Sequence, residues 1–300
     1  SFAVIAPDTR QAFADSPFGT WVWMGRTHGA MAPADISQRL GSILQKGGWR
    51  WSMVEGAPQY KLNKTAIGLP NSYQRIPGWY DEALFAKEVL PVLKKSIADG
   101  DEPVFKVMHE ARSSLEIVRR LSEFLGSTPY EMPAEEKANF EVQYANVLKY
   151  CRAIKQADPA ARIILINDYP TVGIEFMKRG FPKDAVDIFG SEGAMFMREP
   201  ERQPDWLSLL GQCETWKRAK RQYGYEDKPV WFTEALYHGT NPGALSPHKQ
   251  GVIYVREGML ALANGIERLG SMGTPRDYTD DYRQTAWGCT GFCGRDPEFP

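Results

Sequence analysis

The chain alternates between short apolar runs and longer segments in which apolar residues recur every three or four positions. Short runs rich in β-branched and aromatic residues predict strands, whereas the three-to-four spacing predicts amphipathic helices. The predicted strands are 18–24, 49–55, one within 60–68, 103–110, 161–168, 184–193, 228–235 and 266–273. The predicted helices are 33–48, 81–100, 134–159, 172–179, 205–224 and 248–265. In the helix 81–100, Pro91 is expected to produce a kink.

Strands that alternate with helices indicate parallel pairing through right-handed crossovers. Seven or eight such units in about 250 residues are typical of a (β/α)8 TIM barrel, so the predicted fold class is α/β with one domain over residues 1–300. A doubly wound sheet is the main competitor. It is weakened because the glycine-rich phosphate loops GxGxxG and GxxxxGK[ST] are both missing from the sequence.

Composition narrows the range of partners. With 43% hydrophobic residues, the chain can bury one large core. Lys and Arg total 36 against 37 for Asp and Glu, so no electrostatic argument favours nucleic acid or an anionic membrane surface. No apolar run approaches the roughly 20 residues that span a bilayer. The start without Met agrees with a removed leader, so we expect an extracellular or periplasmic protein.

The four cysteines do not form a metal-binding pattern. Cys151, Cys213, Cys289 and Cys293 include no CxxC pair and have no histidine partner at zinc-ligand spacing. We therefore predict buried or free thiols, no metal and no cofactor, with a Cys289–Cys293 disulfide as the alternative.

Two of the predicted strands carry a glutamate at their carboxyl ends: Glu110 is the last residue of 103–110, and Glu234 is the last but one of 228–235. In barrel enzymes the catalytic groups lie at the carboxyl ends of the strands, and two carboxylates at one mouth are what glycoside hydrolysis requires. Either glutamate alone could instead cap a helix or lie in solvent. The pair favours a catalytic interpretation.

The stretch "KPVWFTEALYHG" (228–239) resembles the seventh strand of the large clan of retaining (β/α)8 glycoside hydrolases, in which the nucleophile follows a P-V-W-x-T-E pattern. "VMHEARSS" (107–114) sits where that clan carries its acid/base glutamate at the end of strand four. The resemblance covers approximately residues 18–273, and it is specific only at strand seven. It implies a glycosidase acting on a poly- or oligosaccharide, with Glu234 as nucleophile and Glu110 as acid/base.

One position departs from the clan pattern. The clan usually has Asn directly before the acid/base, where it contacts the sugar 2-hydroxyl, and this chain has His109. An imidazole can make a similar hydrogen bond, so we expect His109 to bind substrate.

Two further acids lie at the carboxyl ends of predicted strands. Asp168 ends the fifth strand, directly after Asn167, and is an alternative to Glu110 as the catalytic acid. Glu192 lies at the end of the sixth strand and is a third active-site carboxylate or a sugar ligand. Tyr237 and His238, just after Glu234, are expected at the mouth of the barrel.

Aromatic residues supply candidate sugar subsites. Indole rings stack on the C–H faces of sugars, and Trp79 and Trp287 fall in predicted loops. The expected partner is thus a carbohydrate. A barrel that binds carbohydrate without turnover is the alternative function.

Overall fold

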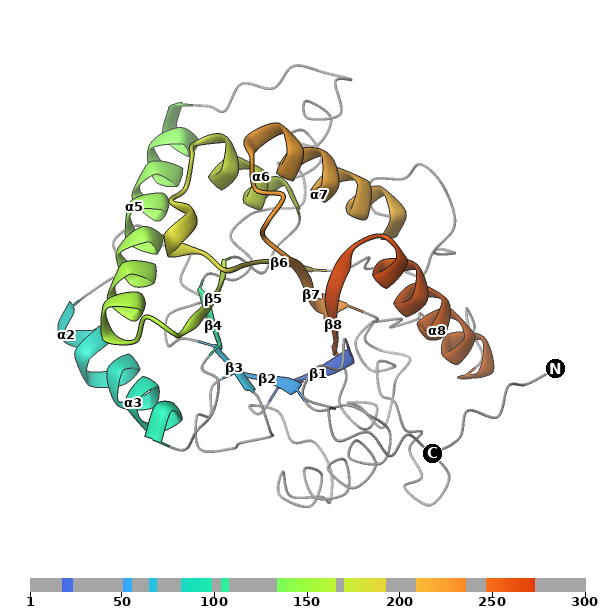
Figure 1. Cartoon of the computed structure of the whole chain (residues 1–300), viewed down its shortest axis with the longest axis horizontal. Coiled ribbons are helices and arrows are strands. Elements are labelled where there is room, and N and C mark those ends of the chain that lie inside the picture. Colours follow the sequence, from blue (N-terminus) through green and yellow to red (C-terminus); the bar gives the residue numbers. More distant parts are fainter. Residues whose placement is uncertain are drawn as a thin grey trace.

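Eight parallel strands form a ring at the centre of the molecule (Figure 1). The structure is a computed structural model that describes residues 18–23, 51–55, 65–68, 82–98, 104–107, 134–165, 170–192, 209–235 and 247–272. Neighbouring strands pair in chain order, and β1 also pairs with β8, with Phe18 opposite Leu269. The strands are β1 (Phe18–Trp23), β2 (Trp51–Glu55), β3 (Thr65–Gly68), β4 (Val104–Val107), β5 (Arg162–Leu165), β6 (Ile188–Glu192), β7 (Val230–Ala235) and β8 (Ile266–Met272).

The described helices lie outside the ring, from the side of β4 round to the side of β8 (Figure 1). They are α2 (Glu82–Leu84), the π-helical turn η2 (Phe85–Val89), α3 (Leu90–Ala98), α5 (Ala134–Ala157), α6 (Pro170–Lys178), the 3₁₀ turn η3 (Lys183–Ala185), α7 (Leu209–Tyr223) and α8 (Pro247–Ala263). The predicted α/β class with parallel strands is confirmed. The predicted helix 33–48 lies outside the described residues.

The helical segment that contains Pro91 changes its hydrogen-bonding pattern just before the proline. The turn directly before it, Phe85–Val89, is π-helical, and the α-helix resumes at Leu90. Proline has no N–H to donate to the carbonyl four residues earlier, at Lys87. A wider π turn at this point accommodates the missing bond, because π turns and prolines both interrupt the α-helical ladder.

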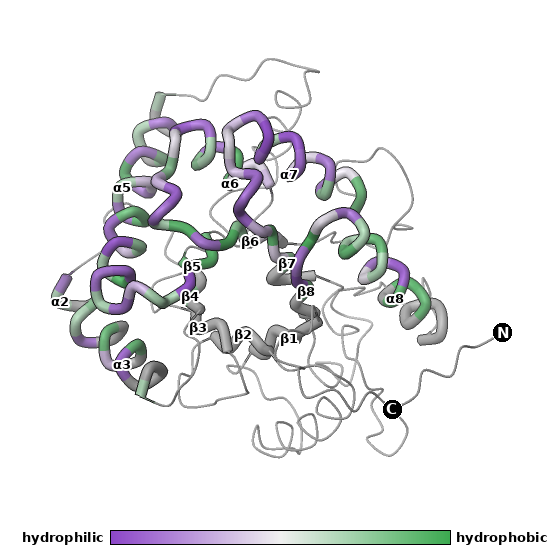
Figure 2. Tube along the Cα trace, in the orientation of Figure 1, coloured by the Kyte–Doolittle hydropathy of each residue, from purple (hydrophilic) through white to green (hydrophobic). Residues whose placement is uncertain are grey.

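The main core lies between the strands and the helices. Three strands each contribute a fully buried phenylalanine to it: Phe105 on β4, Phe189 on β6 and Phe232 on β7. They share one cluster with helical residues such as Trp216. The Phe189 and Trp216 rings lie 5.8 Å apart, which joins β6 to α7. Hydrophobic residues accordingly dominate β5 and β6, whereas the helices carry both hydrophobic and hydrophilic residues (Figure 2).

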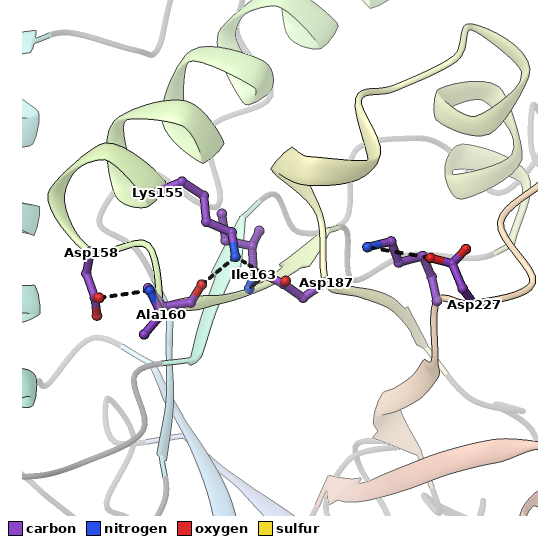
Figure 3. Close-up of polar contacts among 8 residues, drawn as sticks. Lys155, Asp158, Ala160, Ile163, Asp187 and Asp227 are labelled. Carbon is purple, nitrogen blue, oxygen red and sulfur yellow. Dashed lines mark hydrogen bonds and ion pairs between the residues drawn. The ribbon is translucent and has the colours of Figure 1, made fainter.

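An ionic network ties together the chain around the starts of β5 and β6 (Figure 3). Asp187, just before β6, accepts hydrogen bonds through Oδ2 from the backbone N–H of Ile163 at 2.7 Å and from Lys155 Nζ at 2.7 Å. Lys155 also donates to the carbonyl of Ala161 at 2.8 Å. One carboxylate therefore holds the end of α5 and two strands in place.

The contact between α6 and α7 is close because it uses a glycine. A Cβ added at Gly173 would lie 2.3 Å from Cη2 of Trp216, whose side chain is 1% exposed. The absence of a side chain at position 173 thus lets the indole pack directly on the α6 backbone.

Cys151 and Cys213 are both free and buried, as predicted. Cys289 and Cys293 lie outside the described residues. Within the described part of the chain, no helix combines the length and apolar character needed to cross a bilayer.

Candidate active site

The two faces of the strands can be assigned from their packing. On β6 and β7, Phe189, Val230 and Phe232 belong to the helix-side core. Because side chains alternate along a strand, Gly190 and Trp231 face the interior of the ring. These two are register partners, as expected for residues that share a face.

The carboxyl ends of β6 and β7 bring two glutamate positions side by side. Glu192 is the register partner of Glu234, and the register shifts by one residue just before this pair. Strict alternation from Trp231 would place position 234 on the helix side. The extra residue, Thr233, instead puts it on the same interior face as position 192.

The register with β8 supports the same assignment independently. Phe232 pairs with Leu269 and Ala235 with Ser271, so β7 again carries one residue more than its neighbour. Ser271 shares a face with Leu269, which is in the helix-side core. Ala235 therefore lies on the helix side, and position 234 directly before it lies on the interior face.

Below this pair, the ring interior holds a stack of two arginines on one indole. Trp231 is 2% exposed, and its ring has the guanidinium carbon of Arg268 at 4.7 Å and that of Arg162 at 5.3 Å from its centroid. Both distances are within the range of a cation–π interaction. Arg268 is the register partner of Trp231 on β8, whereas Arg162 reaches it from β5.

Of the predicted site residues, the structure describes the backbone of Glu192 and Glu234 and brings these two positions together. The others lie outside the described residues: Trp79, His109, Glu110, Asp168, Tyr237, His238 and Trp287. The sequence pattern did not single out Arg162 and Arg268. Arg162 alternates with the core residues Ile163 and Leu165, which was a signal for an interior position. Arg268 lies two residues after the core residue Ile266, so regular alternation would put it on the helix side, and the register shift beside Trp231 moves it to the interior face.

The groups with displaced pKa values in the described part belong to the outer layer. Burial raises the pKa of Tyr225, whose hydroxyl donates to the carbonyl of Phe181 at 2.6 Å. Burial lowers the pKa of Lys220 on α7, against the opposing effect of Asp227 and Glu226. Both are explained by packing of the helices. Within the described ranges, no group of three or more His, Cys, Asp or Glu residues could hold a metal ion.

No family model and no curated protein matches the chain. Solved structures do resemble it. A calcium-binding mutant of Bacteroides uniformis β-glucuronidase 2 aligns with a TM-score of 0.56 at 12% identity, over 92% of this chain and 32% of that one. The GH39 enzyme from Xanthomonas axonopodis pv. citri aligns with a TM-score of 0.51 at 13% identity, over 97% and 64%.

A further structure of Bacteroides uniformis β-glucuronidase gives a TM-score of 0.50 at 13% identity, over 94% of this chain and 29% of that one. The chain thus spans about a third of the glucuronidases and just under two thirds of the GH39 enzyme. At these identities the likeness shows a shared fold.

Proposed function

We propose that the chain is a (β/α)8 glycoside hydrolase that cleaves a poly- or oligosaccharide with retention of anomeric configuration. Glu234 is the nucleophile in this proposal, and Glu110 is the general acid and base. The parallel ring of strands and its likeness to glycoside hydrolases support the fold on which the proposal rests.

One observation carries the proposal: Glu192 and Glu234 are register partners at the carboxyl ends of β6 and β7. Catalytic groups of parallel barrels lie at this end of the strands. Further back along the strands, Lys106, Ile164 and Ile188 are register partners across β4, β5 and β6. Because Glu110 and Asp168 come four residues after Lys106 and Ile164 in the sequence, we propose that they join Glu192 and Glu234 at the same mouth of the barrel.

Two carboxyl groups at one mouth have the chemistry of a double displacement. Glu234, ionised, attacks the anomeric carbon while Glu110 donates its proton to the leaving oxygen, which gives a covalent glycosyl-enzyme and a free alcohol. Glu110 then takes a proton from water, and the resulting hydroxide displaces Glu234 from the sugar. Retention requires the two carboxyl groups to lie about 5 to 5.5 Å apart.

The remaining predicted residues have supporting roles. His109 binds the sugar hydroxyl next to the reacting carbon. Asp168 accepts hydrogen bonds from other hydroxyls or competes for the acid role, and Glu192 is a third active-site carboxylate or a sugar ligand. Trp79, Tyr237, His238 and Trp287 form the walls of the subsites. We further propose that residues 1–300 act as one catalytic domain outside the cytoplasm, without metal or cofactor.

The test is chemical rescue on a panel of aryl glycosides and polysaccharides. Glu234→Ala should lose turnover by at least about 10⁴-fold, and azide should restore it to give a glycosyl azide of inverted configuration. Glu110→Ala should keep the first step on substrates with good leaving groups and give a retained azide product.

The matched control is Glu214→Ala, at an exposed position on α7, which should keep full activity. Full activity in Glu234→Ala would refute the nucleophile, and loss confined to Asp168→Ala would move the acid role to β5. A wild-type protein that gains thermal stability with a glycan but releases no sugar would instead be a carbohydrate-binding barrel.

A further inference from the structure

We propose that Arg162 and Arg268, held on the Trp231 ring, form a positively charged floor that keeps Glu234 ionised between catalytic cycles. The proposal rests on the proposed function for the role of Glu234. It goes further by assigning a positioning role to three residues that do not reach the substrate.

The floor lies one interior row below the acids. Gly190 pairs with Trp231 and Trp231 with Arg268, whereas Glu192 and Glu234 pair two residues further along β6. A strand rises about 3.3 Å per residue, so the two rows are roughly 7 Å apart along β6. At this separation, a half-buried arginine still stabilises the ionised form of a carboxyl group, although less than it would in a fully buried site.

The Trp231 ring keeps the charges of the floor in place. Trp231 is 2% exposed, whereas Arg162 and Arg268, which lie over its ring, are half-buried. The register partner of Trp231 on β6 is Gly190, which has no side chain. An arginine stacked on an aromatic ring loses little further freedom when it also acts electrostatically, because its planar group is already oriented.

The interior carries charges of both signs. The positive charge of the floor opposes the effect of the neighbouring carboxylates on the ionisation of Glu234. Glu192 is the partner of Glu234, and two neighbouring carboxylates disfavour each other's ionised form. The proposed function adds the carboxyl groups of Glu110 and Asp168 and the imidazole of His109 to the groups that titrate in this site. On the basic side, Lys106 occupies an interior position on β4, because Phe105 and Val107 pack in the helix-side core. Arg162 and Arg268 place positive charge over Trp231, three residues before Glu234 on β7.

The experiment reads the Glu234 carboxyl directly. Protein labelled with ¹³C at glutamate Cδ is titrated by NMR, and the Glu234 signal is assigned by its loss in Glu234→Gln. Arg268→Gln should raise the titration midpoint of Glu234 by about one pH unit. Arg268→Lys keeps the charge and should restore most of the shift. The acidic limb of kcat/KM should move upward with the midpoint.

The control is Arg179→Gln. The Arg179 guanidinium also lies over an aromatic ring, at 4.3 Å from the centroid of Phe140, but in the outer helix layer. Its loss should leave the Glu234 midpoint unchanged. If Arg268→Gln does not fold, as judged by circular dichroism, Arg162→Gln tests the same floor from β5.

An unchanged Glu234 midpoint in a folded floor variant would overturn the proposal. An equal shift in Arg268→Lys and Arg268→Gln would also overturn it, because packing rather than charge would then be responsible. The NMR midpoint does not require turnover. A shifted midpoint in a protein that cleaves no glycan would therefore support the role of the arginines in the ionisation of Glu234 and would contradict the proposed glycosidase activity.

Discussion

Glu192 and Glu234 are register partners at the carboxyl ends of β6 and β7, and Thr233 is the extra residue that makes them so. A strand with regular alternation would have put these two positions on opposite faces of the sheet. The bulge gives the interior two neighbouring acids where the hydrophobic pattern alone gives one.

Removing the charge at position 192 should make Glu234 easier to ionise. In Glu192→Gln, the acidic limb of the kcat/KM profile should move down by about one pH unit, because a like charge next to a carboxylate favours its protonated form. The acidic limb should thus shift in the direction opposite to the shift expected for Arg268→Gln. A limb that stays in place, in a variant with wild-type stability, would show that the two carboxyl groups do not interact.

The network around Asp187 should contribute measurably to stability. Asp187→Ala removes the acceptor for the Ile163 N–H and the partner of Lys155, so we expect a loss of about 2 kcal/mol in the free energy of unfolding. The control is Asp227→Ala. Its carboxylate is 62% exposed and lies 3.9 Å from Lys228 (Figure 3), so its removal should cost less than about 0.5 kcal/mol. Equal losses in urea unfolding would contradict this ranking.

Gly173 should not tolerate a methyl group while Trp216 is present. The added Cβ would overlap a ring atom of a fully packed indole, and overpacking of this kind costs about 1 to 3 kcal/mol. In a Trp216→Phe background that ring atom is gone, so Gly173→Ala should be neutral or slightly stabilising, as alanine favours helix. The check is a double-mutant cycle by thermal or urea unfolding. Equal effects in the two backgrounds would argue against the contact.

Cys213 should make stability fall at alkaline pH. Burial raises the pKa of its thiol from 9.0 to about 12, against an opposing effect of Lys217. The folded protein therefore holds the thiol proton more tightly than the unfolded chain, and this contribution is complete below pH 9.0 and lost as the pH rises toward 12.

Between about pH 8 and about pH 10, the wild type should lose about 1.4 kcal/mol more stability than Cys213→Ala. Urea unfolding under reducing conditions measures this difference. Parallel pH profiles for the two proteins would mean that the thiol is accessible to water in the folded state.

Much of the fold follows from local pattern. β1, β2, β7 and β8 begin and end within two residues of the predicted strands, because short β-branched and aromatic runs between helical segments have few other interpretations. The long helix α5 likewise ends at Ala157, directly before Asp158-Pro159. The structure also shows the third strand, which the sequence indicated only weakly, at Thr65–Gly68.

The register and the interior charges were harder to predict. A one-residue bulge depends on how two neighbouring strands pair, and the β7 sequence alone does not reveal that Thr233 is the extra residue. Arg162 and Arg268 appear in the sequence as ordinary surface charges. Their position over Trp231 depends on contacts between strands that lie far apart in the chain.

The pairing of β1 with β8 affects how the protein is made. The first strand of the ring meets its second neighbour only when the last strand has been synthesised. Until residue 272 leaves the ribosome, the growing sheet has two unpaired edges, which can pair with other chains. Contacts between such distant parts of a sequence also form slowly. Cellular yield should therefore depend on protecting an open, incomplete sheet during synthesis.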